Sequence, residues 1–154
     1  MNRLHPRIRL LWVARAVVVA LVVGGLTGAG VLFAPFSIPI YAPVVTGGFF
    51  LVTGVGFALL RYRAWRYELR DDSLYLQRGV FTKVNTVVPF VRIQHVDSAR
   101  GPIERLAGLA STIVYTAGSR GADVSIPGLT PDGAEDLQER LKRLAIRAEG
   151  DDAV

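Results

Sequence analysis

The sequence predicts a membrane protein in two parts, a pair of transmembrane helices followed by a small, mainly β domain that a C-terminal helix closes. The first observation is a run of 45 uncharged residues, 16–60, in a chain of 154. The second is the alternation of apolar and polar residues after residue 64, which is typical of half-buried strands. The third is the helical spacing of apolar residues between 134 and 144. We therefore expect a basic flank and hairpin over 1–63, a domain over 64–148 and a disordered tail over 149–154.

The uncharged run is long enough for two membrane crossings. One crossing needs about 20 apolar residues, and Pro35, Pro39 and Pro43 interrupt the middle of the run. We expect one helix over about 11–33 and a second over about 44–60. A cleaved signal peptide is disfavoured, because its apolar region has only about 7–15 residues. A buried hairpin of a soluble protein is disfavoured, because the run has no polar face to present to water.

Arginine residues flank both ends of this run, whereas the turn carries no charge. Positively charged flanks stay on the cytoplasmic side of a membrane. The sequence therefore predicts a multi-pass protein of the cell membrane with both termini in the cytoplasm. Aromatic and basic side chains gather at membrane interfaces, and those expected there are Trp12, Arg15, Arg61, Arg63, Trp65 and Arg66.

Small residues recur four positions apart within the run, at Gly24 and Gly28, at Gly25 and Ala29, and at Gly54 and Ala58. Such pairs let transmembrane backbones approach closely. They indicate either packing of the two helices within one hairpin, which we favour, or association between chains. Because no ionisable residue lies inside the run, the sequence does not support a transporter or channel.

The charge distribution argues against a nucleic-acid partner. The net charge is +5, but all 13 acidic residues and 14 of the 18 basic residues follow residue 60. A nucleic-acid binder concentrates its positive surplus on the folded domain, whereas here most of the surplus precedes it. The chain has no cysteine, which excludes disulfides, thiolate metal sites and cysteine nucleophiles.

The domain is expected to contain six or seven antiparallel strands. Strands at about 65–69 and 74–77 flank a turn at 71–73, and further strands are expected at about 82–89, 91–98, 111–117 and 122–126. A helical turn is expected over 101–108, and a loop over 118–121. Thr130 is the expected N-cap of the last helix, with Pro131 at its first position. This order predicts a small barrel or sandwich with one end capped.

Several short blocks of the domain are distinctive. They are Tyr67-Glu68-Leu69, Leu76-Gln77-Arg78-Gly79-Val80-Phe81, Val87-Val88-Pro89, Arg92-Ile93-Gln94-His95-Val96-Asp97, Gly101-Pro102-Ile103-Glu104-Arg105-Leu106-Ala107-Gly108-Leu109-Ala110, Tyr115-Thr116-Ala117-Gly118 and Ile126-Pro127-Gly128-Leu129. Together with the two preceding helices, they resemble the bacterial pleckstrin-homology-like family of YdbS-like membrane proteins. The resemblance implies a PH-like split barrel of two bent sheets, capped by the last helix. It implies little about activity, because a fold does not determine a function.

The resemblance does not extend to the phosphoinositide site known from pleckstrin-homology domains. That site uses several Lys and Arg side chains around the first hairpin. The corresponding turn here is Arg70-Asp71-Asp72-Ser73, and its two carboxylates repel an anionic headgroup. We therefore do not expect that lipid site in this chain.

No arrangement of residues indicates catalysis, so we expect neither an enzyme nor a cofactor or metal. His95 is the domain's one imidazole and is interpreted as a strand residue with a local hydrogen bond. The best candidate interaction surface comprises Arg92, Gln94, Arg100 and Arg105. The competing interpretation is structural, with Ile103 and Leu106 filling the core and Arg105 paired to a nearby acid.

We expect a membrane-anchored interaction module at the cytoplasmic face. Its partners are the lipid bilayer and either another protein or a second copy of the chain. The alternative function is a membrane-proximal module that senses a ligand or peptide in envelope stress or antimicrobial resistance.

Overall fold

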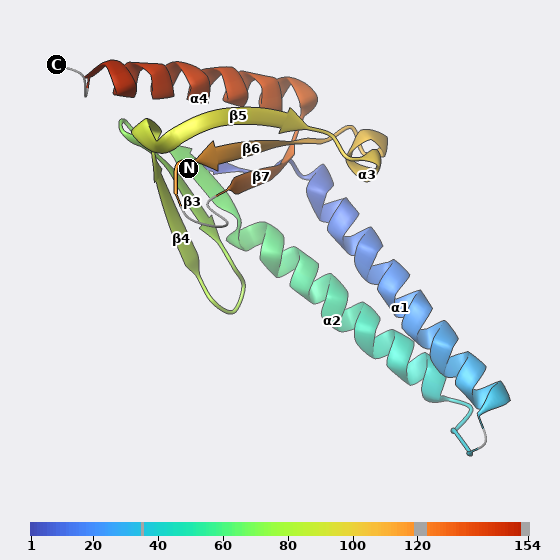
Figure 1. Ribbon diagram of the computed structural model, residues 1–154. Helices are drawn as coiled ribbons and strands as arrows, with labels where there is room; N and C mark the ends of the chain where they lie inside the picture. Colours follow the sequence, from blue (N-terminus) through green and yellow to red (C-terminus); the bar gives the residue numbers. More distant parts are fainter. Residues whose placement is uncertain (35, 119–122, 152–154) are drawn as a thin grey trace. The chain divides into compact units, whose positions relative to one another are not determined.

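The computed structural model describes residues 1–34, 36–118 and 123–151, which form two compact units. One unit is the segment Arg9–Arg63, and the other combines Met1–Ile8 with the chain from Ala64 onward. Figure 1 shows the two long helices of the first unit and the sheets and helices of the second. The first eight residues thus belong to the same unit as the chain from Ala64 onward.

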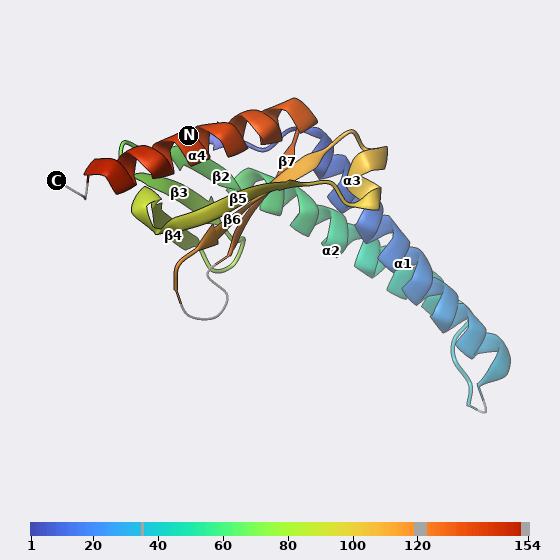
Figure 2. The same cartoon turned by 45° about the horizontal axis from the view of Figure 1, so that its top comes forward.

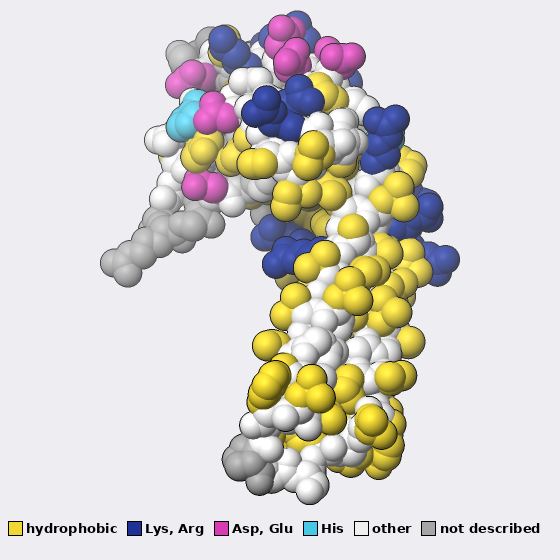
Figure 3. Space-filling view, turned by 90° about the vertical axis from the view of Figure 1, so that its right-hand side faces the viewer, with side chains coloured by type: hydrophobic (Ala, Val, Ile, Leu, Met, Phe, Trp, Pro, Cys, Tyr) yellow, Lys and Arg dark blue, Asp and Glu magenta, His cyan; other side chains and the backbone are white. Residues whose placement is uncertain are grey.

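The hairpin consists of α1 (Arg7–Phe33) and α2 (Ala42–Ala64). Both helices are long and apolar enough to cross a membrane, and α1, at 27 residues, is about 40 Å long. On the face shown in Figure 3, hydrophobic side chains are spread along the segment Arg9–Arg63 and charged ones gather at one end. This distribution suits a lipid environment, because uncharged side chains face the hydrocarbon and arginines stay near the headgroups.

The expected packing within the hairpin is confirmed for three of the glycines. A Cβ at Gly24 would lie 3.3 Å from the Pro43 carbonyl oxygen, and one at Gly54 would lie 2.9 Å from the Ala16 Cβ. Gly28 also faces Pro43, whereas Gly25 has no atom within 4 Å of its Cβ position. The Thr46 hydroxyl lies 3.2 Å from the Thr27 hydroxyl and hydrogen-bonds across the two helices. Small residues therefore bring the two backbones together, as in other transmembrane pairs.

The domain contains two antiparallel sheets within the described residues. The first has the order β1 (Asn2–Arg3), β2 (Arg66–Leu69), β3 (Ser73–Arg78) and β4 (Val84–Pro89). The second has the order β5 (Ile93–Ala99), β6 (Ala110–Thr116) and β7 (Val124–Leu129), and the 3₁₀ turn η1 (Phe90–Arg92) leads from β4 into β5. The short helix α3 (Pro102–Leu106) connects β5 to β6. Figure 2 shows α3 beyond the end of β5 and α4 (Pro131–Asp151) along the sheets.

The sequence did not reveal β1, which is the first strand of the domain although it precedes the hairpin. Asn2 pairs with Tyr67 and Arg3 with Arg66, so the hairpin is an insertion between the first two strands of one sheet. Leu4 is 2% exposed and Ile8 is 3% exposed, and the His5 N–H donates to the Gly128 carbonyl at 2.7 Å. The N-terminal segment therefore completes both the first sheet and the core.

Helix α4 covers the core as its sequence predicts. Thr130 is its N-cap, because its hydroxyl accepts from the Gly133 N–H at 3.1 Å. Ala134, Leu137 and Leu141 are buried. Gln138 donates to the Val96 carbonyl at 2.8 Å, which ties the helix to β5.

Several expectations differ from the structure. Residues 149–151 continue α4 instead of starting a disordered tail, while 152–154, and 119–122 of the expected loop and strand, lie outside the described residues. Ile103 and Leu106 do not fill the core, since they are 65% and 91% exposed. Leu109, which follows α3, is fully buried and anchors this connection in their place.

Candidate interaction surface

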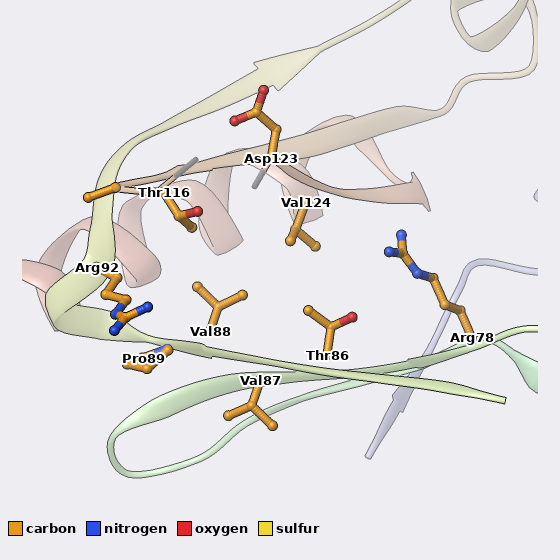
Figure 4. A pocket seen from close by; sticks show the side chains of 11 residues that line it. Arg78, Thr86, Val87, Val88, Pro89, Arg92, Thr116, Asp123 and Val124 are labelled. Carbon is orange, nitrogen blue, oxygen red and sulfur yellow. The ribbon is translucent and has the colours of Figure 1, made fainter. Parts of the chain in front are cut away.

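A cleft of about 410 Å³ lies between β4 and the facing ends of β6 and β7. In Figure 4, Thr86 and Val88 point from β4 into this space and Val124 points into it from the opposite side. Arg78 and Arg92 stand at its two ends, and Asp123 lies on the side of β7. We call this space the β4 cleft. Its full lining is Arg78, Thr86, Val87, Val88, Pro89, Arg92, Thr116, Ala117, Gly118, Asp123 and Val124.

Strand β4 supplies the floor of the cleft and one free edge. Its side chains alternate between two faces, so Thr86 and Val88 face the cleft while Val87 points away and is 53% exposed. Because β4 is the last strand in its sheet, one side of its backbone has no neighbouring strand among the described residues. Such an edge offers N–H and C=O groups to an added strand.

The side chains that line the β4 cleft carry more positive than negative charge. Neither Arg78 nor Arg92 makes an ion pair in the part of the chain that the structure describes, and Asp123 is the acidic residue of the lining. Arginine binds carboxylates in a bidentate geometry. The arrangement can therefore hold an extended segment that carries acidic side chains, with main-chain hydrogen bonds along β4.

A second, smaller hollow of about 310 Å³ lies between β5 and α4, and Gln94 and His95 contribute to it. The His95 ring stacks on Tyr115, with ring centroids 4.1 Å apart and an interplanar angle of 16°. Its Nε2 is 3.9 Å from an Asp97 carboxylate oxygen, and both side chains are more than half exposed. The strand position expected for His95 is found. Its contacts are a ring stack and a long approach to the Asp97 carboxylate, and Gln138 occupies part of the neighbouring β5 edge.

The four residues of the expected interaction surface do not form one patch. Arg92 and Gln94 lie at the start of β5, whereas Arg100 and Arg105 follow its end. The seven residues of β5 span about 23 Å and lie between Arg92 and Arg100. Arg92 lines the β4 cleft. The structure therefore divides the candidate surface into a cleft end and an α3 end.

The residues expected at the membrane interface are divided between the hairpin and the domain. Within the hairpin unit, the Arg61 guanidinium lies 4.4 Å from the Trp12 ring centroid and Arg9 lies 5.8 Å from that of Tyr62. These cation–π contacts join the charged ends of the two helices. Arg15 lies beside Trp12 and Arg61 in a hollow of the hairpin, and Arg63 is in the last turn of α2.

Two of the expected interface residues belong to the domain. Arg66 pairs with Arg3 and Gln77 in the first sheet. Trp65 is 5% exposed, so its side chain is a core residue and cannot reach the headgroups. An aromatic residue beside arginines is common at an interface, but the same residue can also begin a buried strand.

Sequence reasoning missed Arg78, Thr86, Val88 and Asp123 as parts of one site. Arg78 ends β3, Thr86 and Val88 lie on β4, and Asp123 precedes β7. Their spacing along the chain follows no motif. The one available signal was the alternation of Thr86 and Val88, which predicts a common face but not what that face meets.

Comparison with known proteins supports the fold. Residues 8–145 match the family described as "Bacterial PH domain". The chain is similar to the transmembrane protein YdbS of Bacillus subtilis (strain 168), with 36% identity over 86 residues, which are 56% of this chain and 52% of YdbS. It is also similar to the transmembrane protein YdbT of the same organism, with 22% identity over 117 residues, which are 75% of this chain and 24% of YdbT. The chain thus spans about half of YdbS and about a quarter of YdbT. No solved structure matches the chain.

Proposed function

The chain belongs to the bacterial PH domain family, and we propose that it is a membrane-anchored, non-catalytic interaction module that binds a protein partner at the cytoplasmic face. The observation that carries this proposal is the β4 cleft, in which Arg78 and Arg92 flank a strand whose outer edge pairs with no other strand among the described residues. The partner is a segment in extended conformation with acidic side chains, supplied by another protein or by a second copy of this chain.

The open edge favours a polypeptide over a small ligand. A strand edge binds by main-chain hydrogen bonds, which another peptide backbone matches along its whole length. The cleft supplies side-chain selection in addition, because the half-buried Thr86 faces it between the two arginines. Its lining combines arginine, threonine and one aspartate with apolar groups, a composition suited to binding a peptide.

Removal of the Arg92 side chain is expected to weaken partner capture by about tenfold to a hundredfold, because hydrogen bonds to charged groups contribute about 1.5–3 kcal/mol. The measurement is crosslinking in intact membranes, followed by detergent extraction and quantification of the crosslinked partner or homodimer. Arg140→Ala is the matched control, since Arg140 is exposed on α4 and does not line the cleft.

Two results of this experiment would argue against partner binding at the β4 cleft. Equal capture by the wild type, Arg92→Ala and Arg140→Ala would contradict the assignment of the cleft. Recovery of monomer alone, with a lipid or small molecule bound, would instead favour the ligand-sensing function. Arg105→Ala tests the other end of β5, and loss of capture there as well would mean that the partner spans both halves of the surface.

The cytoplasmic orientation is supported by charge and by pairing within the domain. Arginines precede and follow the apolar hairpin, and β1 pairs with β2, so the two ends of the hairpin return to one folded unit. Residues on both sides of an inserted hairpin can share a sheet only if they lie on the same side of the membrane.

A reporter that is active only outside the cytoplasm is expected to stay silent when fused after Val154. The same reporter inserted in the turn between α1 and α2 is expected to be active, because this turn lies across the membrane. Reversed activities of the two fusions, measured at equal protein levels, would overturn the proposed orientation.

A further inference from the structure

Two exposed apolar tips project from the domain. Ile103 and Leu106 on α3 are 65% and 91% exposed, and Phe81 in the turn between β3 and β4 is 89% exposed. Side chains of this size lose about 1.5–3 kcal/mol each by remaining in water. Both turns therefore present apolar surface to the surroundings of the domain.

Both tips are held in place by local structure. In α3, Pro102 occupies the first turn and the Gly101 N–H donates to the Glu104 carboxylate at 2.9 Å. The Leu109 N–H donates to the Glu104 carbonyl at 2.8 Å, which fixes the exit from the helix. The other tip depends on Gly79, whose φ is +103° and whose Cβ would collide with the Thr82 carbonyl oxygen. The conformations of both apolar tips are therefore defined by the fold.

The tips lie at the end of the domain that contains Arg7 and Arg66, the domain residues close in sequence to the hairpin. The guanidinium of Arg7, the first residue of α1, lies 3.2 Å from the Cβ position of Gly108, just after α3. On the other sheet, Arg66 follows α2 and pairs with Gln77, next to the turn that carries Phe81. The uncharged run begins nine residues after Arg7, a rise of about 13 Å in a helix. Chain connectivity alone thus keeps this end of the domain close to the headgroup layer.

The charges around the tips suit an anionic surface. Arg100 and Arg105 are exposed beside Ile103 and Leu106, and Lys83 is exposed beside Phe81. Glu104, the acidic residue of α3, directs its carboxylate to the Gly101 N–H. Basic side chains beside apolar ones are the pattern of a segment that lies in the membrane interface.

We propose that α3 and the turn between β3 and β4 form a second membrane contact, separate from the transmembrane hairpin. Leu106, Ile103 and Phe81 enter the interfacial layer, while Arg100, Arg105 and Lys83 bind anionic lipid headgroups. The occupant of this surface is the bilayer that the hairpin crosses. Contact at both tips orients the domain on the membrane and leaves the opposite end of β5, with Arg92, facing the aqueous phase.

The absence of cysteine from the chain allows a site-specific test in the full-length protein. Single variants Leu106→Cys, Phe81→Cys and Val91→Cys are labelled with an environment-sensitive fluorophore. They are reconstituted into vesicles of phosphatidylglycerol and phosphatidylcholine in equal parts, with nitroxide-bearing lipids as quenchers. Val91 is the matched control, because it is an apolar residue 48% exposed at the opposite end of β5.

We expect blue-shifted emission and several-fold stronger quenching at positions 106 and 81 than at position 91. Quenching at 106 and 81 no stronger than at 91 would refute the membrane contact. In the Leu106→Cys background, Arg105→Gln is expected to reduce the contact equilibrium about fivefold, since each basic residue near an anionic surface contributes about 1 kcal/mol. Arg140→Gln on α4 is expected to have no effect. These readouts need no protein partner, so they are independent of the proposed function.

Discussion

The variant Leu4→Ala is expected to destabilise the domain by about 3 kcal/mol, although residue 4 precedes both transmembrane helices. Leu4 is 2% exposed in the core, and truncation of a buried leucine to alanine costs about 2–5 kcal/mol. Domains of this size are stable by only about 5–15 kcal/mol. The loss corresponds to a fall in melting temperature of roughly 12–24 °C, which thermal unfolding of the solubilised full-length protein measures.

Leu106→Ala is the control for this prediction, because it makes the same chemical change at a leucine that is 91% exposed. Its effect in detergent is expected to stay within about 0.5 kcal/mol. Equal melting temperatures of Leu4→Ala and the wild type would show that residues 1–8 do not belong to the folded domain.

The variant Gly128→Ala is expected to cost about 2–4 kcal/mol of folding free energy. Gly128 has φ +67°, a left-handed conformation that costs an L-residue about 1–2 kcal/mol. Its added Cβ would lie 2.7 Å from the Ile8 Cβ, and overpacking of this kind costs about 1–3 kcal/mol. The Gly128 carbonyl also accepts a hydrogen bond from the His5 N–H. The substitution is therefore expected to push the N-terminal segment away from β7 as well.

Limited proteolysis provides the measurement for Gly128→Ala. Cleavage near residues 1–8 is expected to accelerate, together with a lower melting temperature. Gly150→Ala is the control, because it lies in α4 with no atom within 4 Å of its Cβ position, and alanine there favours the helix. Unchanged proteolysis and melting of Gly128→Ala would contradict the close packing of the N-terminal segment on β7.

Much of the fold was predictable because its signals are local. The two membrane helices follow from uncharged composition, and α4 follows from its apolar spacing and from Thr130. Strands β2 to β7 follow from alternation and turn residues, with boundaries a few residues from those expected. β1 was not predictable, because two residues carry no periodic pattern and their partners Arg66 and Tyr67 are more than sixty positions away.

The candidate site was predictable only in part. Arg92 was singled out and lines the β4 cleft, but Arg78 and Asp123 come from other strands. Arg100 and Arg105 were grouped with Arg92 because they are close in sequence. The intervening strand holds them apart, since an extended chain advances about 3.3 Å with every residue.

By itself, the sequence determined that this chain has two apolar helices suited to a membrane, an antiparallel β domain of the bacterial PH family and a capped C-terminal helix. Those features depend on composition and on periodicity between near neighbours. Only the tertiary structure decided that residues 1–8 complete the domain, that Ile103 and Leu106 face outward and that Arg78 and Arg92 share a cleft. Periodicity shows which residues share a face, whereas the pairing of distant segments decides which face is covered.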